Sequence, residues 1–366
     1  MWAALDYLVR AIYTTFGSLD AAAIHPVRAT PMVIRAVLRR LVIVLPLTLA
    51  SLAMVFVITR LLPGDPVFLI LGEQSDAAQR AQVRHQLGFD QSLPVQFWHF
   101  IVNFARGDWG TSLVTGSPVM DDLKRTAPST FELATLSMIL AIAIGITLGC
   151  RAAVRPGGVV DVLSDLFSAI AISLPTFWVG IVAIYVFYVQ LGMVPPPSGQ
   201  MDPSIQQPVF RTGMLLVDSL LAGKLDAFGS AFAHAILPVA TLTFVLSAPI
   251  VRQTRSEMQQ ALASPYVEFA ELCGLPGSTV VRYALRNALL PIITTIGVLY
   301  SITLGGAVLV ETVFGWAGLG QYAVQAVTSS DYFAIQDIVL VTTLFSVVVY
   351  LAVDALHALA DPRIRH

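Results

Sequence analysis

Few residues in the sequence are placed to do chemistry, and none matches a pattern for catalysis or nucleotide binding. Ser173, Ser247 and Ser301 lie in apolar runs without a motif that supplies a base, and serines in such runs commonly bond a helix backbone. Neither an H-E-x-x-H metal motif nor a G-x-x-x-x-G-K-[ST] phosphate loop occurs. The glycine-rich "GWAGLG" (Gly315–Gly320) follows no strand pattern and predicts a turn. We therefore expect that the chain itself is not an enzyme.

The histidine and cysteine residues likewise indicate no metal site. His234 has no His or Cys at ligand spacing, so we expect an interfacial or buried histidine with a hydrogen bond. Cys150 and Cys273 have no C-x-x-C partner and are interpreted as free thiols. We expect neither a metal nor a cofactor bound to this chain.

The most informative polar stretch is "YVEFAELCGLPGSTVVRYALRNALLP", Tyr266 to Pro291. Ser264 precedes a proline and Gly274 provides a left-handed stop, so Pro265–Cys273 is predicted to be one short helix of about 14 Å. Ser278 is expected to cap a second helix. A helix this short cannot cross a bilayer and is expected to lie on its surface. The hairpin either transmits movement from a cytoplasmic partner or is a solvated connector, and the residues alone do not decide.

The composition around this stretch is that of an all-α integral membrane protein. Of 366 residues, 56% are hydrophobic and 12% charged, and the mean hydropathy is +0.76. A net charge of −2 gives no reason to expect nucleic acid as a partner. A bilayer core needs about 20 apolar residues per helix. Six runs meet this need and predict six transmembrane helices: Leu41–Thr59, Leu133–Cys150, Leu166–Leu191, Ala227–Val251, Asn287–Val310 and Ile335–Leu359.

The positive charges between these runs predict the orientation. Arginines gather in one set of flanking segments, whereas the opposite short loop from Glu311 to Ala334 has no Lys or Arg. Since positive residues favour the cytoplasmic side, both termini are predicted to lie inside. The arginines that decide this are Arg35, Arg39, Arg40, Arg151, Arg155, Arg252, Arg255, Arg282, Arg286, Arg363 and Arg365.

Two segments lie outside the predicted bundle. Residues 63–130 are expected to form an extracytoplasmic lid of short helices, one ending at Gly88, one from about Pro94 to before Gly107, and one after Pro118. Residues 1–34 form an extension whose apolar residues recur at helical spacing. This pattern is typical either of an interfacial helix or of a partner-binding helix, and both interpretations stay open.

Prolines mark candidate hinges within the predicted spans. Pro175 in the third span and Pro238 and Pro249 in the fourth remove backbone hydrogen bonds and favour kinks. Phe177 and Trp178 follow Pro175 and are candidate pathway residues. Static kinks that never move are the alternative interpretation of all three prolines.

Close helix packing is predicted in the second span. Gly145 and Gly149 lie four residues apart, with Ala141 one turn earlier. Small residues at this spacing let two helix backbones approach each other in a membrane.

Several motifs of this sequence resemble motifs of one protein family, and they occur in the same order along the chain. "EFAELCG" (Glu268–Gly274) resembles the E-A-A-x-x-x-G loop of permease subunits in binding-protein-dependent ABC importers, with Phe269 in place of the middle alanine. The chain after Arg35 is similar to dipeptide, oligopeptide and nickel importer permeases, specifically their first-permease branch. The matching pieces are "LRRLVIVLPLTLASLAMVFVITRLLPGDP", "GDWGTSLVTGSPV", "SLPTFWVGI", "ALRNALLPIIT", "ETVFGWAGLGQ" and "DPRIR".

The resemblance implies a type I importer permease fold. Its first transmembrane helix would occupy residues 35–62, and its core, residues 131–366, would hold five more helices and a cytoplasmic coupling loop at 252–286. It also implies a sister permease, two ATPase subunits that bind ATP and magnesium, and an extracytoplasmic binding protein. By residue-to-residue match, the coupling residues would be Glu268, Ala270 and Gly274, flanked by Tyr266, Phe269 and Leu275.

The function implied by the resemblance is ATP-driven uptake of peptides across a bacterial or archaeal cytoplasmic membrane. Nickel or another small solute is the alternative substrate within the same family. A secondary carrier or channel that works without ATPases is the rival class. A proton-coupled carrier is expected to place acidic residues near the membrane midplane, and the first five predicted spans hold none.

Overall fold

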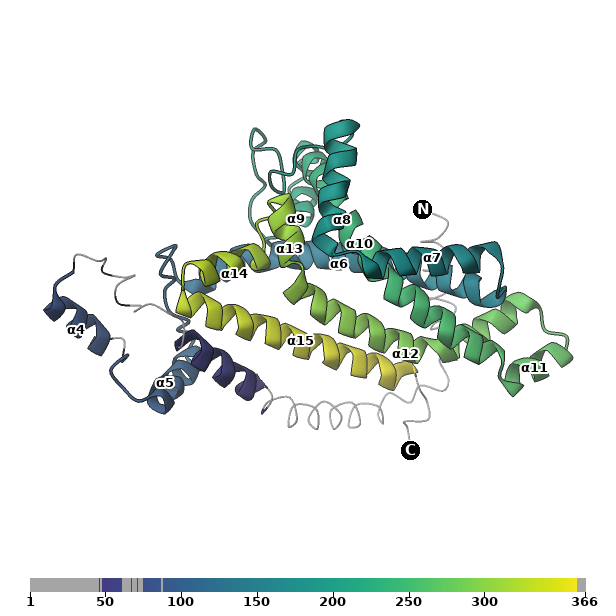
Figure 1. Ribbon diagram of the computed structural model, residues 1–366, viewed down its shortest axis with the longest axis horizontal. Helices are drawn as coiled ribbons and strands as arrows, with labels where there is room; N and C mark the ends of the chain where they lie inside the picture. Colours follow the sequence, from purple (N-terminus) through teal and green to yellow (C-terminus); the bar gives the residue numbers. More distant parts are fainter. Residues whose placement is uncertain are drawn as a thin grey trace.

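The computed structural model describes residues 46, 48–60, 67, 71, 75–86 and 88–360, and helices joined by loops make up this part of the chain (Figure 1). The predicted extension 1–34, residues 41–45 and 47 of the first predicted span, and Arg363 and Arg365 lie outside these residues. The helices are Thr48–Arg60, α4 Ala77–Gln86, α5 Leu93–Ala105, α6 Val119–Val154, α7 Val159–Ser173, α8 Thr176–Ala183, η1 Ile184–Gln190, α9 Leu215–Leu221, α10 Leu225–Leu262, α11 Pro265–Leu272, α12 Gly277–Gly306, α13 Val308–Phe314, α14 Leu319–Thr328 and α15 Tyr332–Ala360.

Four described helices are long and apolar enough to cross a membrane, namely α6, α10, α12 and α15. They contain the second, fourth, fifth and sixth predicted spans, although the fifth stops early because α12 ends at Gly306. Thr48–Arg60 is a shorter apolar helix that overlaps the first predicted span and ends one residue beyond it. The described residues therefore contain four spans, or five if a bent helix pair counts as one.

The third predicted span is not one continuous helix. Its residues form α7 and then α8 with η1, and the two parts meet at an angle of 102°. Leu174 has an extended backbone and Pro175 precedes the first turn of α8. A proline disfavours helical geometry in the residue before it and lacks an N–H, so the helix ends there. The hinge predicted at Pro175 is a break in the structure.

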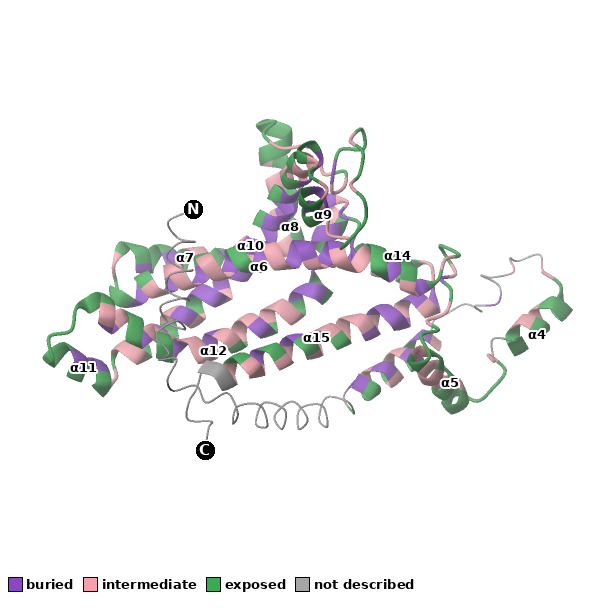
Figure 2. Ribbon diagram, turned by 180° about the vertical axis from the view of Figure 1, so that it is seen from behind, coloured by how far each residue is buried: buried purple, intermediate pink, exposed green. Residues whose placement is uncertain are grey.

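The core forms where α6 and α10 lie against each other (Figure 2). Gly149 in α6 faces Thr254 and Val251 in α10, where an added Cβ would lie 2.6 Å from Thr254 Cβ and 2.8 Å from the Val251 carbonyl oxygen. Gly145 faces Ile250 so closely that a Cβ would overlap its side chain. The predicted close approach is confirmed, and it fixes α6 and α10 as one unit.

A buried glutamate joins α6 to the short helix α9. Glu132, in α6, accepts hydrogen bonds from the backbone N–H groups of Leu215 at 3.0 Å and Leu216 at 2.8 Å. The first N–H groups of a helix have no partner within it, and a carboxylate satisfies them well. Glu132 therefore holds α9 against the bundle.

A second buried glutamate organises the turn that the sequence predicted at "GWAGLG". Glu311, in α13, accepts hydrogen bonds from Thr130 Oγ1 at 2.5 Å and from the Gln321 N–H at 3.0 Å, at the start of α14. Gly315 is left-handed with φ 63°, and Trp316 donates to the Ser129 carbonyl at 3.1 Å. Burial raises the pKa of the Glu311 carboxyl, and these hydrogen bonds oppose the rise.

The predicted short helices of the segment 63–130 are present as α4, α5 and the start of α6. α5 lies against the helix Thr48–Arg60. The ring centroids of Phe97 and Phe100, in α5, are 5.4 and 6.2 Å from the ring centroid of Phe56 in that helix. α4 has no buried residue and lies at one end of the molecule (Figure 1). The third helix continues without interruption into the second span, so residue 130 falls inside α6.

We predict that Gly149→Leu destabilises the protein by about 1–3 kcal/mol, because the new side chain would force α6 away from the α10 backbone. Thermal unfolding of the purified chain in mild detergent measures the effect as a fall in Tm of several degrees.

The matched control is Gly229→Leu. Gly229 also lies inside a helix, and nothing lies within 4 Å of an added Cβ there. An equal loss of stability in both variants would contradict the assignment of Gly149 to a close helix contact.

Candidate functional site

The predicted surface hairpin is present as α11, a turn and the start of α12. Pro265 occupies the first turn of α11, as predicted, but the Ser264 hydroxyl makes no capping hydrogen bond. It bonds instead to the Ala261 carbonyl at the end of α10. The predicted hydroxyl cap is therefore wrong, while the helix boundary is correct within one residue.

The C-terminal end of α11 closes with a Schellman motif. Gly274 is left-handed with φ 75°, its N–H bonds to the Glu271 carbonyl at 2.9 Å, and the Leu275 N–H bonds to the Ala270 carbonyl at 3.2 Å. These two bonds satisfy carbonyls at the helix end. The left-handed stop predicted at Gly274 is confirmed.

The inner face of α11 packs on its own hairpin. Val267 and Ala270 are buried together with Val280 of α12, and Leu262 at the end of α10 packs against them. This small cluster fixes α11 to both long helices that it connects. A displacement of α11 must therefore move the ends of α10 and α12.

The opposite face of α11 is apolar and exposed. Leu272 is 82% exposed and Phe269 68% exposed, and Tyr266 and Leu275 are each exposed by more than a third. We call these four residues the α11 outer face. Large apolar side chains that protrude together from a surface mark a site for contact with a partner or with a membrane.

The structure divides the predicted coupling residues into two groups. Glu268, Tyr266, Phe269 and Leu275 are exposed, whereas Ala270 is buried in the hairpin and Gly274 shapes its turn. The sequence analysis missed Leu272, the most exposed of the apolar side chains of α11. Its spacing of three residues from Phe269, which in turn lies three after Tyr266, was the signal that would have found it.

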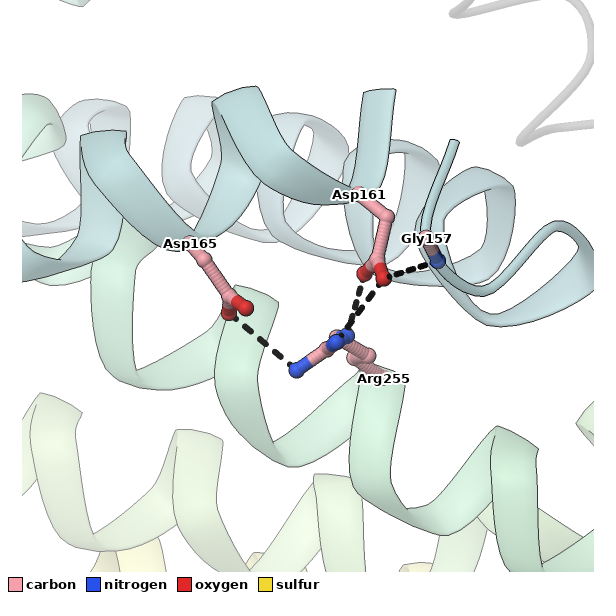
Figure 3. Close-up of polar contacts among 4 residues, drawn as sticks. All are labelled: Gly157, Asp161, Asp165 and Arg255. Carbon is pink, nitrogen blue, oxygen red and sulfur yellow. Dashed lines mark hydrogen bonds and ion pairs between the residues drawn. The ribbon is translucent and has the colours of Figure 1, made fainter. Parts of the chain in front are cut away.

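An ion-pair cluster lies near the base of the hairpin and was also missed by the sequence analysis (Figure 3). Arg255, two turns before the end of α10, donates to Asp161 Oδ2 at 2.9 Å and to Asp165 Oδ1 at 3.1 Å. Both aspartates belong to α7. We call Arg255, Asp161 and Asp165 the Arg255 cluster.

The candidate hinge and pathway residues lie in different environments. Pro175 is exposed at the break between α7 and α8, and Phe177 and Trp178 are 40% and 45% exposed just after it. Pro238 is buried and Pro249 half-buried within α10, which stays helical through both. The structure thus brings three of the five together and leaves two inside a continuous helix.

No cluster of three or more His, Cys, Asp or Glu side chains suited to a metal ion occurs among the described residues. Cys150 is half-buried and Cys273 exposed, and both are free thiols, as predicted. His234 is half-buried, with Nδ1 2.8 Å from the Ser230 carbonyl oxygen.

We predict that Gly274→Ala loosens the hairpin, because a side chain in the left-handed region costs about 1–2 kcal/mol. Hydrogen exchange of the α11 backbone amides is expected to accelerate about 5- to 30-fold. Gly277→Ala is the matched control, since an added Cβ has open space at both glycines and only Gly274 has positive φ. Equal acceleration in both variants would contradict the account.

Comparison with known proteins gives consistent matches along most of the chain. The family model described as the binding-protein-dependent transport system inner membrane component matches residues 145–366, and the model of the N-terminal part of such membrane components matches residues 32–134. A probable D,D-dipeptide transport system permease protein of Escherichia coli is 41% identical over 84% of this chain and 91% of its own. A di/tripeptide transport system permease protein of Pseudomonas aeruginosa is 37% identical over 90% and 98%.

Among solved structures, an inward-facing MetNI methionine ABC transporter aligns at 17% identity over 65% of this chain and 96% of that chain, with a TM-score of 0.47. That likeness supports no argument of its own. The family models and the curated relatives each cover most of the sequence, in an all-helical chain with several apolar spans. The chain therefore belongs to the family of binding-protein-dependent transport system inner membrane components.

Proposed function

We propose that the chain is the permease subunit of an ATP-driven importer that takes up peptides delivered by an extracytoplasmic binding protein. The observation that supports it best is the α11 outer face, an exposed apolar surface on a hairpin anchored to two long apolar helices. Family membership supplies the transport role.

The substrate class rests on the relatives. The curated relatives named above act on D,D-dipeptides and on di- and tripeptides, by their names. Their identity of 37–41% to this chain extends over most of both sequences. We therefore propose short peptides as the class of substrate.

In the proposed mechanism α11 inserts its outer face into a groove on an ATPase subunit. An amphipathic helix in a groove places its apolar side chains, spaced three or four residues apart, against the partner. Phe269 requires a pocket wide enough for a phenyl ring, where the family motif has alanine. Glu268, exposed in the first turn beside this face, would pair with a positive group of the groove.

The same hairpin provides the route from ATP hydrolysis to the membrane. Val267 and Ala270 pack on Val280 and Leu262, so a movement of the ATPase that draws α11 also draws α10 and α12. Tilting these two spans would open and close a path between this chain and a sister permease. ATP hydrolysis on the ATPase subunits would thus drive the movement of the permease helices.

We further propose six spans with both termini in the cytoplasm of a bacterial or archaeal cell. The ends of α6, α10 and α11 and the start of α12 lie at one end of the molecule, opposite α4 and α5 (Figure 1). The arginines at these ends support a cytoplasmic location, and the α4–α5 end would then face the binding protein.

The first test is peptide uptake. Deletion of this chain's gene is expected to abolish ATP-dependent uptake of a labelled dipeptide by its host, and the restored gene is expected to recover it. Unchanged uptake of a panel of di- and tripeptides in the deletion strain would contradict the peptide assignment.

Glu268→Lys is predicted to reduce uptake at least about tenfold while the amount of chain in the membrane stays constant, because the reversed charge would repel the groove. Glu271→Lys, an exposed glutamate on the same helix, is the control and is expected to have a smaller effect. Full uptake by Glu268→Lys would refute the role of Glu268.

Leu272→Asp is predicted to reduce co-purification of the ATPase subunits in mild detergent about tenfold or more, since it places a charge at the centre of the apolar contact. Leu225→Asp is the matched control, because Leu225 is 73% exposed at the start of α10, away from α11. Equal losses in the two variants would show a general effect of a surface charge and contradict docking by α11.

A further inference from the structure

Arg255 makes a fork of contacts from α10 to α7 (Figure 3). Its Nη2 donates to Asp161 Oδ2 at 2.9 Å, its Nε lies 2.5 Å from Asp161 Oδ1, and its Nη1 donates to Asp165 Oδ1 at 3.1 Å. The Asp161 carboxylate also accepts the Gly157 N–H at 2.8 Å. The guanidinium therefore hydrogen-bonds to Asp161 through Nη2 and to Asp165 through Nη1, while Nε contacts Asp161 only as an ion pair.

The cluster is sheltered enough to constrain the two helices. The side chain of Asp161 is 6% exposed and that of Arg255 27%, whereas that of Asp165 is 53% exposed. Hydrogen bonds from one planar guanidinium to two carboxylates on the same helix fix direction as well as distance. Loss of Arg255 would leave Asp161 buried without its counter-charge. Asp165, screened by solvent, contributes less.

The Arg255 cluster lies between two features of the chain: the α11 hairpin that follows α10, and the break that follows α7. On the α10 side, Arg255 is seven residues before the end of the helix, from which α11 begins three residues later. On the α7 side, the cluster lies near the first turn, and the other end of α7 is the break at Leu174–Pro175. α7 is thus bonded to α10 near the hairpin at one end, and at its other end the chain turns by 102° into α8.

Further along the two helices, the described residues show an apolar contact between α7 and α10. Phe167 meets Phe244 edge to face, with ring centroids 5.2 Å apart. The outward side of α7 is exposed at Val162, Leu163 and Leu166. An apolar contact alone lets one helix slide or rotate on another, whereas the Arg255 fork does not.

We propose that Arg255 is a positioning residue for transport, which makes the start of α7 move with the end of α10 when α11 is displaced, so that the movement reaches the break at Leu174–Pro175. This inference rests on the proposed function. It adds a third helix, α7, to the two that are joined to α11 through the chain.

The transport test compares Arg255→Gln and Arg255→Lys with the matched control Arg252→Gln, an exposed arginine three residues earlier in α10. Arg255→Gln is expected to reduce peptide uptake about tenfold, while assembly with the ATPases and ATP hydrolysis persist. Arg255→Lys keeps the charge but loses the fork and is expected to be intermediate. Arg252→Gln is expected to transport normally.

A double-mutant cycle identifies the partner of Arg255. Arg255→Gln combined with Asp161→Asn is expected to transport no worse than Arg255→Gln alone, because both changes remove the same contact. Asp165→Asn is expected to have less effect than Asp161→Asn. Fully additive losses, or a parallel fall of uptake and of assembled complex, would overturn the positioning role in favour of an ordinary structural ion pair.

A distance measurement tests the inference without a transport assay. Spin labels at exposed Val162 in α7 and Gln260 in α10, with Cys150 and Cys273 replaced by serine, report the separation of the two helices in the assembled complex. The separation is expected to stay constant between nucleotide-free and ATP-trapped states, and to change or broaden in Arg255→Gln.

An unchanged distance distribution in Arg255→Gln would overturn the inference, because apolar packing alone would then hold α7 to α10. Absence of peptide uptake by the wild-type complex, together with the expected label distances, would instead contradict the proposed substrate and leave the link between the helices intact. The two failures are therefore distinguishable.

Discussion

The close contact between α6 and α10 is the constraint on which the other arrangements depend. Gly145 and Gly149 allow the α10 backbone to lie where any side chain would exclude it. In a membrane, where lipid is as apolar as leucine, such close approach supplies much of the attraction between helices. Because α6 leads to α7 and α10 leads to α11, the contact also brings the start of α7 and the hairpin to the same end of the molecule.

Several buried charged groups fix directions that apolar packing leaves open. Glu132 and Glu311 each satisfy the free N–H groups at the start of a short helix, α9 and α14. The Arg255 cluster instead joins α10 to α7 by side-chain ion pairs, at the other end of the molecule. Each of these groups fixes the orientation of one helix relative to another, which apolar packing alone leaves undetermined.

Much of this architecture could be predicted from the sequence, because apolar length and glycine stops are local signals. The turn at Gly274 and the packing of Gly145 and Gly149 are examples, and the family of the chain followed from ordered motifs. The break between α7 and α8 was predicted only as a kink. The apolar run continues on both sides of Pro175, and from the sequence alone a proline that kinks a helix cannot be told from one that ends it. The contact of Arg255 with Asp161 joins residues 94 positions apart, and no local pattern predicts it.

Site-specific photo-cross-linking at Leu272 tests most directly the claim that the α11 outer face docks on an ATPase. A photoreactive amino acid there, in the intact membrane, is expected to form an adduct with an ATPase subunit, whereas the same group at buried Val267 is expected to form none. Adducts at Leu272 with lipid alone, or equal adducts at both positions, would contradict the account.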